Sequence, residues 1–206
     1  MKTTLFSVTL LLALLLTATS HLLAQESVTE PSTGKIFPAE VKVQYGGTDY
    51  VLKVTGVAVR KKVVFKVYGM AHYMQDPAKG SSREAFAALL SEGKAKQIVM
   101  DFARDVDVGK IQDAYKDGFK EHASAEELKQ IQPLIDRFIG YITKDIKVND
   151  RYVLRWFPTG TVVAVLQGEE KPAIVNETFA RTLWSIWLGE DSIVDRDALI
   201  ARIVSN

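Results

Sequence analysis

The sequence predicts an α+β fold in which helices are layered on one face of a large antiparallel β-sheet. Short segments rich in valine and aromatic residues, several of them alternating between apolar and polar positions, are joined in pairs by glycine and proline turns. Segments with apolar residues at helical spacing follow each group of such pairs. Strands and helices that come in groups, rather than in strict alternation, indicate antiparallel pairing. No repeat or linker divides the chain, so we expect one globular domain.

Residues 1–24 are typical of a secretory signal. Lys2 is their only charged residue, an apolar run covers positions 5–16, and small residues then lead to expected cleavage sites after Ser20 or Ala24. The apolar run is too short to span a bilayer comfortably, so we expect no permanent membrane anchor. The expected destination is a periplasm, with secretion from the cell as the alternative.

The rest of the chain divides into two parts. Residues 25–35 are polar and are expected to form a flexible N-terminal arm, and residues 36–206 are expected to form the folded domain. The chain has no cysteine, which excludes disulfides, thiol catalysis and thiolate metal sites. With 26 basic against 25 acidic residues its charge is nearly balanced, and we expect no nucleic-acid partner.

The first part of the domain is predicted to be β-structure. Residues 40–45 and 49–54 flank Gly46 and Gly47 as a hairpin, and residues 55–74 are predicted to supply the third and fourth strands. Three later segments have the same character and are predicted strands. They are residues 97–102, 151–157 and 161–167.

Arg60 lies at the start of the apolar stretch in this region, and two interpretations of it remain open. With Lys61 and Lys62 it would belong to a solvated hairpin tip. Alternatively, a guanidinium that lies along an apolar strand requires an anion, and a carboxylate matches its planar fork. From Val63 onwards apolar and polar side chains alternate, which predicts a strand with one face on a core.

The helices are predicted from start and stop signals as well as from spacing. Ser81 and Ser124 are each followed three residues later by glutamate, as in a capping box. Pro133 lies inside the longest helical pattern and is expected to kink or divide it. Asn176 is expected to cap a helix that Gly189 closes. The predicted helices cover residues 81–90, 110–122, 124–142, 176–189 and 195–204.

The residue types exclude several classes of chemistry. None of the three histidines is spaced with another histidine or a carboxylate as a metal site requires. His72 could be an acid or base, but a lone histidine in a strand is more often a core or surface residue. Motifs for phosphate loops, dinucleotides and serine hydrolases are absent. We therefore expect no metal, no cofactor and no catalytic residue.

A group of arginines and aromatic residues remains as the candidate binding site. Trp184 and Trp187 are three residues apart on a predicted helix, so they share one face, and the alternative is that both simply pack on the sheet. The candidates considered together are Arg60, Tyr68, Tyr73, Arg104, Trp184 and Trp187.

Several of these residues lie in segments that resemble the chalcone isomerase-like superfamily, specifically its bacterial secreted branch. The segments occur in the family's order and together extend over nearly all of residues 35–205. They are GVAVR at 56–60, FKVYGMAHY at 65–73, FARD at 102–105, WFPTGT at 156–161 and IWLG at 186–189.

The resemblance implies an open-faced β-sandwich, with helices on one face of a large antiparallel sheet. In plant chalcone isomerases an arginine stabilises the attacking phenolate, whereas related plastid proteins bind fatty acids and pair that arginine with a tyrosine on the next strand. By position in the motif, the arginine corresponds to Arg60. The tyrosine corresponds to Tyr68, where the isomerases have a threonine, so the resemblance favours a binding protein over an enzyme.

The chain departs from the family pattern at several positions. Ala58 replaces the second glycine of the motif, and the segment between Arg60 and Tyr68 is shorter than in the plant proteins, which leaves open whether these two side chains converge. Ile186 stands where the isomerases have threonine or serine. Their tyrosine, lysine and asparagine have no clear counterparts in residues 108–120.

The leading hypothesis is a periplasmic, non-catalytic binding protein for an amphipathic carboxylate such as a fatty acid. Arg60 would pair with the carboxylate and Tyr68 would add a hydrogen bond, with Tyr73 and Trp184 as further binding residues. One alternative is a chalcone isomerase-type intramolecular lyase, in which Arg60 stabilises a developing oxyanion. The other is a structural or assembly partner in the cell envelope that binds no ligand.

Overall fold

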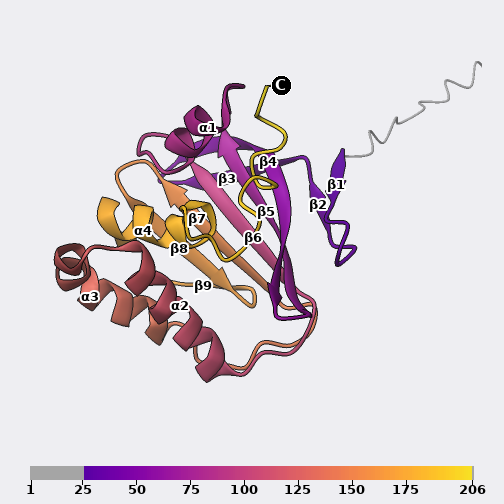
Figure 1. Ribbon diagram of the computed structural model, residues 1–206. Coiled ribbons are helices and arrows are strands. Elements are labelled where there is room, and N and C mark those ends of the chain that lie inside the picture. The colour runs from indigo at the N-terminus through magenta and orange to yellow at the C-terminus, as the bar shows by residue number, and fades with distance from the viewer. Residues whose placement is uncertain (1–25, 206) are drawn as a thin grey trace, which may run out of the picture.

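The computed structural model describes residues 26–205, so the predicted signal segment lies outside the described residues. Within them, an eight-stranded antiparallel sheet has the strand order β10-β8-β7-β6-β5-β4-β3, with β9 paired to β8 (Figure 1). This confirms the predicted α+β fold. The strands of this sheet are β3 (Glu40–Tyr45), β4 (Thr48–Lys62), β5 (Phe65–Gln75), β6 (Lys96–Phe102), β7 (Arg151–Phe157), β8 (Thr161–Leu166), β9 (Glu169–Glu170) and β10 (Ile174–Val175).

A small second sheet lies at the N-terminal end of the described chain. It pairs β1 (Ser27–Thr29) with β2 (Ile36–Pro38) in antiparallel register. The turn between them is closed by the buried Glu30 carboxylate, which accepts the backbone N–H of Ser32 at 2.9 Å and that of Thr33 at 2.7 Å. Much of the segment expected to be a flexible arm is therefore hydrogen-bonded structure.

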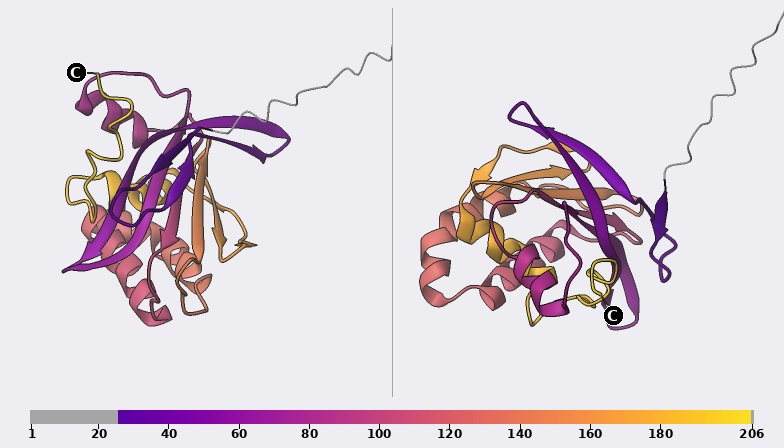
Figure 2. Two further views of the ribbon diagram at one scale, coloured as in Figure 1. Left: turned by 90° about the vertical axis from the view of Figure 1, so that its right-hand side faces the viewer. Right: turned by 90° about the horizontal axis from the view of Figure 1, so that it is seen from above.

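The helices cover a single side of the curved sheet, as the two views in Figure 2 show. Both predicted capping boxes are present, at Ser81 and at Ser124. The third helix continues through Pro133 without being divided, so of the two expected effects of this proline only the kink stays a prediction. The helices are α1 (Ser82–Leu89), α2 (Val108–His122), α3 (Ala125–Gly140) and α4 (Glu177–Leu188).

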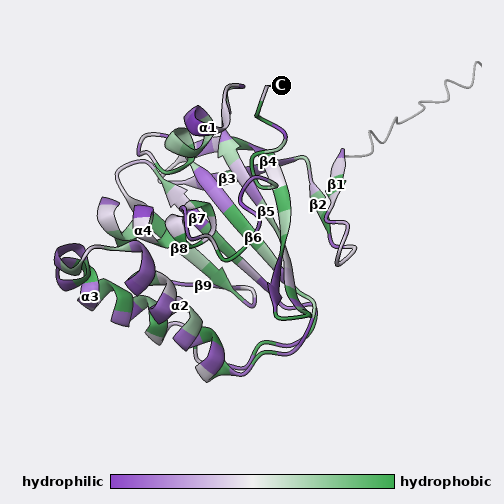
Figure 3. Ribbon diagram, viewed as in Figure 1, coloured by the Kyte–Doolittle hydropathy of each residue, from purple (hydrophilic) through white to green (hydrophobic). Residues whose placement is uncertain are grey.

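Two hydrophobic cores occupy opposite faces of the sheet. The helix-side core lies between the sheet and the helices, whose hydrophobic residues alternate with hydrophilic ones along α2 and α3 (Figure 3). The curl-side core lies on the other face, where the sheet bends so far that Tyr45 of β3 stacks on Phe157 of β7 at 4.4 Å. The helix-side core includes Ala58, Tyr68, Met70, Met100, Phe102, Tyr115, Trp184 and Trp187. The curl-side core includes Leu52, Val54, Ala71, Tyr73, Val99 and Phe157.

Strand β4 is one strand of 15 residues, where the sequence predicted two. Its pairing with β5 shifts by one residue between Val54 and Gly56, so that Thr55 is an extra residue, a β-bulge. The bulge reverses the alternation of side chains along the strand. Val54, before it, packs in the curl-side core, whereas Ala58, after it, packs in the helix-side core. The sequence pattern carried no signal for this inserted residue.

The alternation predicted from Val63 was also wrong at its start. Val63 and Val64 form the two-residue turn between β4 and β5, because Lys62 pairs with Phe65. Beyond this turn β5 does not alternate between core and solvent either, because residues 68–74 are buried on both faces of the strand, and Tyr68 and Met70 are the first fully buried residues on the helix side.

The C-terminal segment, residues 190–205, is a strap across β4 and not the helix predicted at residues 195–204. Some of its peptide groups close short turns within the strap, such as Leu199 N–H on the Arg196 carbonyl at 3.0 Å, and others bond to other elements. The Arg202 N–H donates to the Thr55 carbonyl at 3.0 Å, and the Thr55 hydroxyl donates to the Leu199 carbonyl at 2.7 Å. The Gly80 N–H donates to the Ile203 carbonyl at 3.0 Å.

Replacing Gly56 with alanine is expected to displace this strap. An alanine Cβ there would lie 2.5 Å from the Leu199 carbonyl carbon, and a backbone atom cannot move away as a side-chain end can. We expect Gly56→Ala to lower the free energy of unfolding by about 1–3 kcal/mol in urea titrations. Gly140→Ala is the matched control, because nothing lies within 4 Å of its Cβ position. If the two variants unfold alike, the strap does not depend on this close approach.

Candidate functional site

Arg60 and Tyr68 face each other on neighbouring strands. They are paired residues in the register of β4 and β5, so their side chains lie on the same face of the sheet. That face is the helix-side core, to which Ala58 and Tyr68 belong. The segment between Arg60 and Tyr68 is short, but both residues lie on the paired strands of the hairpin, so the two side chains do lie side by side.

The Arg60 guanidinium is half-buried and has one hydrogen-bond acceptor among residues 26–205. Its Nη1 donates to the Ile193 carbonyl of the strap at 2.6 Å. No carboxylate pairs with it within the described part of the chain. A guanidinium has five N–H donors in a planar fork, so most of its donors remain available. Of the two interpretations of Arg60, the structure fits the one in which it lies beside an apolar core.

Tyr68 is almost fully buried, with 4% of its surface exposed. Its hydroxyl oxygen accepts a hydrogen bond from Trp187 Nε1–H at 2.9 Å. Burial raises the pKa of Tyr68 to about 12, although the Trp187 hydrogen bond and the Arg60 charge both oppose this. The phenol is therefore protonated at neutral pH, and its own O–H has no acceptor among residues 26–205.

Tyr115 of α2 is a third polar group of this region, which the sequence analysis did not single out. It is 4% exposed, and its hydroxyl has no hydrogen-bond partner among the described residues. Burial raises its pKa well above the ordinary value, and the neighbouring Tyr68 and Tyr152 add to this. Its ring contacts Trp187 edge-on, with centroids 6.1 Å apart. In the sequence, the feature that could have indicated Tyr115 is its hydroxyl, which lies on an otherwise apolar face of α2.

Together these groups form a site rich in donors and poor in acceptors. Arg60 supplies charge and unpaired N–H groups, and Tyr68 and Tyr115 each supply an O–H without an acceptor. A buried hydroxyl that lacks its partner costs about 1–3 kcal/mol. The group best able to satisfy several donors and one positive charge at once is an anion with two oxygens, such as a carboxylate.

The other two residues proposed for the site lie elsewhere. Tyr73 is on the opposite face of β5, in the curl-side core, and its hydroxyl donates to the Pro38 carbonyl at 3.0 Å. Trp184 is in the helix-side core, but its Nε1–H donates to His72 Nε2 at 3.3 Å. The tryptophan that contacts Tyr68 is Trp187, one helical turn further along α4.

His72 belongs to a buried series of hydrogen bonds next to the site, which links β4, β5, α4 and the strap. Thr55 Oγ1 lies 2.8 Å from His72 Nδ1 and donates to the Leu199 carbonyl. Since Trp184 N–H donates to Nε2, the consistent form is a neutral His72 with its proton on Nδ1, donated to Thr55. Burial, aided by the charge of Lys96, lowers the pKa of His72 to about 3. This histidine is a structural residue of the core.

The remaining candidates and cavities lie away from this pair. Arg104 is exposed and stacks over the Phe65 ring, its Cζ 4.9 Å from the ring centroid. A surface cavity of about 520 Å³ lies between β4 and the strap, lined by Lys53 and Arg202 among others, and one of about 450 Å³ lies between α1 and the end of α4. In residues 26–205, histidine, aspartate and glutamate side chains nowhere gather as a metal site requires.

No helix within residues 26–205 combines the length and the hydropathy that crossing a bilayer requires.

Comparison with known proteins matches a family model and a number of solved structures. A family model described as chalcone isomerase-like matches residues 33–198. The crystal structure of a fatty-acid binding protein from Arabidopsis thaliana superposes with a TM-score of 0.67 at 18% sequence identity, covering 86% of this chain and 96% of that chain. No curated relative matches the sequence. At this identity, the neighbour establishes a shared fold.

The hydrogen-bond chain through His72 predicts a dependence of stability on pH. The pKa of His72 is lowered from its ordinary value of 6.5 to about 3 in the folded protein, so the unfolded chain takes up a proton first as the pH falls. The stabilisation is complete above the unfolded value and is lost between there and about 3. From about pH 7.5 to about pH 5, wild type should lose about 2 kcal/mol more than His72→Gln does.

Urea unfolding of both proteins at the two pH values measures this difference, and the comparison removes the contribution of the carboxyl groups. His72→Gln should be the less stable protein at neutral pH, because it disturbs the bonds to Thr55 and Trp184. An equal loss of stability in the two proteins would mean that His72 can be protonated in the folded state.

Proposed function

The chain belongs to the chalcone isomerase-like family, and we propose that within it this protein binds an amphipathic carboxylate, such as a fatty acid, without transforming it. The observation that carries the proposal is the cross-strand pair of Arg60 and Tyr68 beside the helix-side core. A cation and a phenol O–H meet there, and no carboxylate from residues 26–205 satisfies them. A ligand carboxylate supplies the two acceptor oxygens and the negative charge that this pair lacks.

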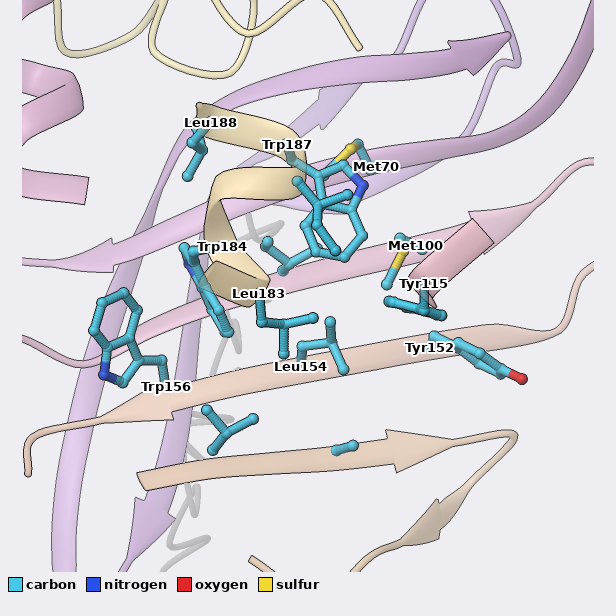
Figure 4. Packing of buried hydrophobic residues seen from close by; sticks show 14 of the residues in the cluster. Met70, Met100, Tyr115, Tyr152, Leu154, Trp156, Leu183, Trp184, Trp187 and Leu188 are labelled. Carbon is cyan, nitrogen blue, oxygen red and sulfur yellow. The ribbon is translucent and has the colours of Figure 1, made fainter. Parts of the chain in front are cut away.

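An apolar tail fits next to this pair. Met70 follows Tyr68 on the same face of β5 and is paired with Met100 of β6. Figure 4 shows Trp187 near Met70 and Tyr115 near Met100 in this core. Unbranched methionine side chains change rotamer readily, so they can yield space to an alkyl chain between sheet and helices. The carboxylate would replace the Ile193 carbonyl at Arg60, and the tail would lie among these residues.

The structural neighbour supports the same assignment. That protein is described as a fatty-acid binding protein, and its fold is matched over most of both chains. Fold alone does not carry function from one protein to another. The proposal for this chain therefore rests on the pair of residues in its own site, and the neighbour indicates that the fold can hold such a ligand.

Two features favour binding without catalysis. Ring closure of a phenolic substrate requires groups that stabilise charge and move protons in the transition state. Ile186 presents only hydrocarbon to the neighbouring helix, where its side chain lies against Gly118. The buried His72 holds its proton in a closed chain of hydrogen bonds, so it is unsuited to proton transfer.

We place the protein in a periplasm on the basis of residues 1–24. Their single lysine, apolar run and small residues have the order of a secretory signal. A protein that binds free carboxylic lipids would there be exposed to lipids released from the surrounding membranes.

Replacing the two paired residues should weaken the binding of a fatty acid selectively. Arg60→Gln removes a charge-assisted interaction worth about 1.5–3 kcal/mol, which is about a tenfold to hundredfold loss of affinity for palmitate. Tyr68→Phe removes a neutral hydrogen bond worth about 0.5–1.5 kcal/mol. Because both residues would contact one carboxylate, the double variant should lose less than the sum of the two. Calorimetric titration measures all three losses.

Methyl palmitate and Arg104→Gln are the controls for this titration. The ester lacks the charge, so its affinity should be low in wild type and nearly unchanged in Arg60→Gln. Arg104 is exposed and stacks on Phe65, so its replacement should leave palmitate binding intact. Binding of the ester as tightly as the acid would exclude recognition of the carboxylate at Arg60.

The proposed location predicts a processed N-terminus. Intact-mass measurement of the protein from a periplasmic extract should give a chain that begins after Ser20 or Ala24, because signal peptidase cleaves after small residues. A Ser20→Lys/Ala24→Lys variant should accumulate unprocessed, since lysine does not fit such a cleavage site. Recovery of wild type with Met1 retained in the cytoplasmic fraction would contradict the location.

A further inference from the structure

The tip of the β4–β5 hairpin, formed by the two-residue turn and the first residue of β5, exposes three consecutive apolar side chains. Val63 is 88% exposed, Val64 77% and Phe65 57%. Scattered single apolar residues are normal on a protein surface, but a run of three at the tip of a projecting hairpin is not explained by folding. The hairpin projects at the lower end of the sheet in Figure 1, next to the loop between β6 and α2.

The turn itself is strained. Val63 has a φ of +57°, a conformation that β-branched residues rarely adopt. A two-residue hairpin turn with positive φ at its first central position is of a kind that normally has glycine there. Local strain of this kind persists where the surrounding structure or a function requires it. Here the strained position keeps an apolar side chain where the fold alone would favour glycine.

Basic residues surround the apolar tip. Lys61, Lys62 and Lys66 flank it and are exposed, and Arg104 stacks over the Phe65 ring at 4.9 Å. Neither Lys61 nor Lys62 pairs with a carboxylate among residues 26–205. Residues 50–75, which include both strands of the hairpin beside the turn, contain no aspartate or glutamate. The hairpin is therefore apolar at its end, and the charges on its own strands beside the turn are all positive.

We infer that this hairpin tip docks on the surface of an anionic lipid bilayer. The apolar side chains would enter the boundary between headgroups and acyl chains, and the lysines would contact the lipid phosphates. Charge complementarity selects an anionic surface over a neutral one. The attachment is peripheral and goes beyond the binding of a carboxylate. It also stands whether or not Arg60 holds a ligand, although Arg60 lies at the base of this hairpin.

Flotation with vesicles tests the inference on the processed protein. Vesicles of equal parts phosphatidylglycerol and phosphatidylcholine should carry wild type upwards, and added sodium chloride should weaken this binding. Vesicles of phosphatidylcholine alone should bind it at least tenfold more weakly. Equal binding to both compositions, or binding to neither, would overturn the inference.

A variant of the turn separates function from folding. Val63→Gly/Val64→Ser should reduce binding to the anionic vesicles at least tenfold, while the relief of strain raises Tm by about 2–4 °C. Val175→Ser is the matched control, because Val175 is 63% exposed on β10 and outside the hairpin. Its binding should equal that of wild type. Loss of vesicle binding in the control as in the turn variant would contradict the role of the tip.

A second pair of variants tests the charges independently of the turn. Lys61→Gln/Lys62→Gln should weaken binding by about fivefold per lysine. Lys120→Gln/Lys129→Gln, on exposed positions of α2 and α3, changes the net charge equally and should have little effect. Equal weakening by both pairs would reduce the effect to net charge and overturn the assignment to the hairpin.

A second copy of the chain is the other partner that the hairpin tip could contact. Mass photometry without lipid tests for such a dimer. We expect wild type to be as monomeric as Val63→Gly/Val64→Ser at the same concentration. A dimer that this variant abolishes would mean that the tip is a protein interface, and it would overturn the inference.

Discussion

The inserted residue Thr55 is the constraint on which the candidate site depends. Side chains along a strand alternate between the two faces, so one extra residue exchanges the faces of everything that follows. Before Thr55, β4 contributes Leu52 and Val54 to the curl-side core. After it, Ala58 and Arg60 lie on the side of the helices, and Arg60 comes opposite Tyr68. Without the bulge, the arginine would lie on the face away from Tyr68 and α4.

The bulge is itself held in place by buried hydrogen bonds. Thr55 bonds to His72 of β5 and to Leu199 of the strap, and His72 in turn accepts from Trp184 of α4. Buried polar groups are favourable only when all of them are satisfied. In this series of hydrogen bonds through Thr55 and His72, each donor has an acceptor. The strap, whose Leu199 carbonyl accepts the last of these hydrogen bonds, also supplies the Ile193 carbonyl to Arg60. A ligand that takes this bond from Arg60 therefore acts on the segment that covers β4.

Local signals in the sequence predicted most elements, and the failures have physical causes. Capping boxes, turn glycines and helical spacing depend on neighbouring residues, so they located α1, α3 and the hairpins. The strap pattern is helical, but several of its peptide groups bond to residues more than a hundred positions away, which no local pattern reveals. In the site, Arg60 and Tyr68 were found through their motif. Tyr73 and Trp184 share an element with site residues but point elsewhere, and Tyr115 resembled an ordinary core residue.

Nuclear magnetic resonance of palmitate labelled with ¹³C at its carboxyl carbon tests most directly whether Arg60 and Tyr68 hold an ionised carboxylate. If Arg60 and Tyr68 bind the charged form, the pKa of the bound carboxyl should lie below that of the acid free in solution, because hydrogen bonds to the charged form favour it. The same resonance in Arg60→Gln should titrate at a higher pH. A bound carboxyl that titrates identically in both proteins would contradict the account.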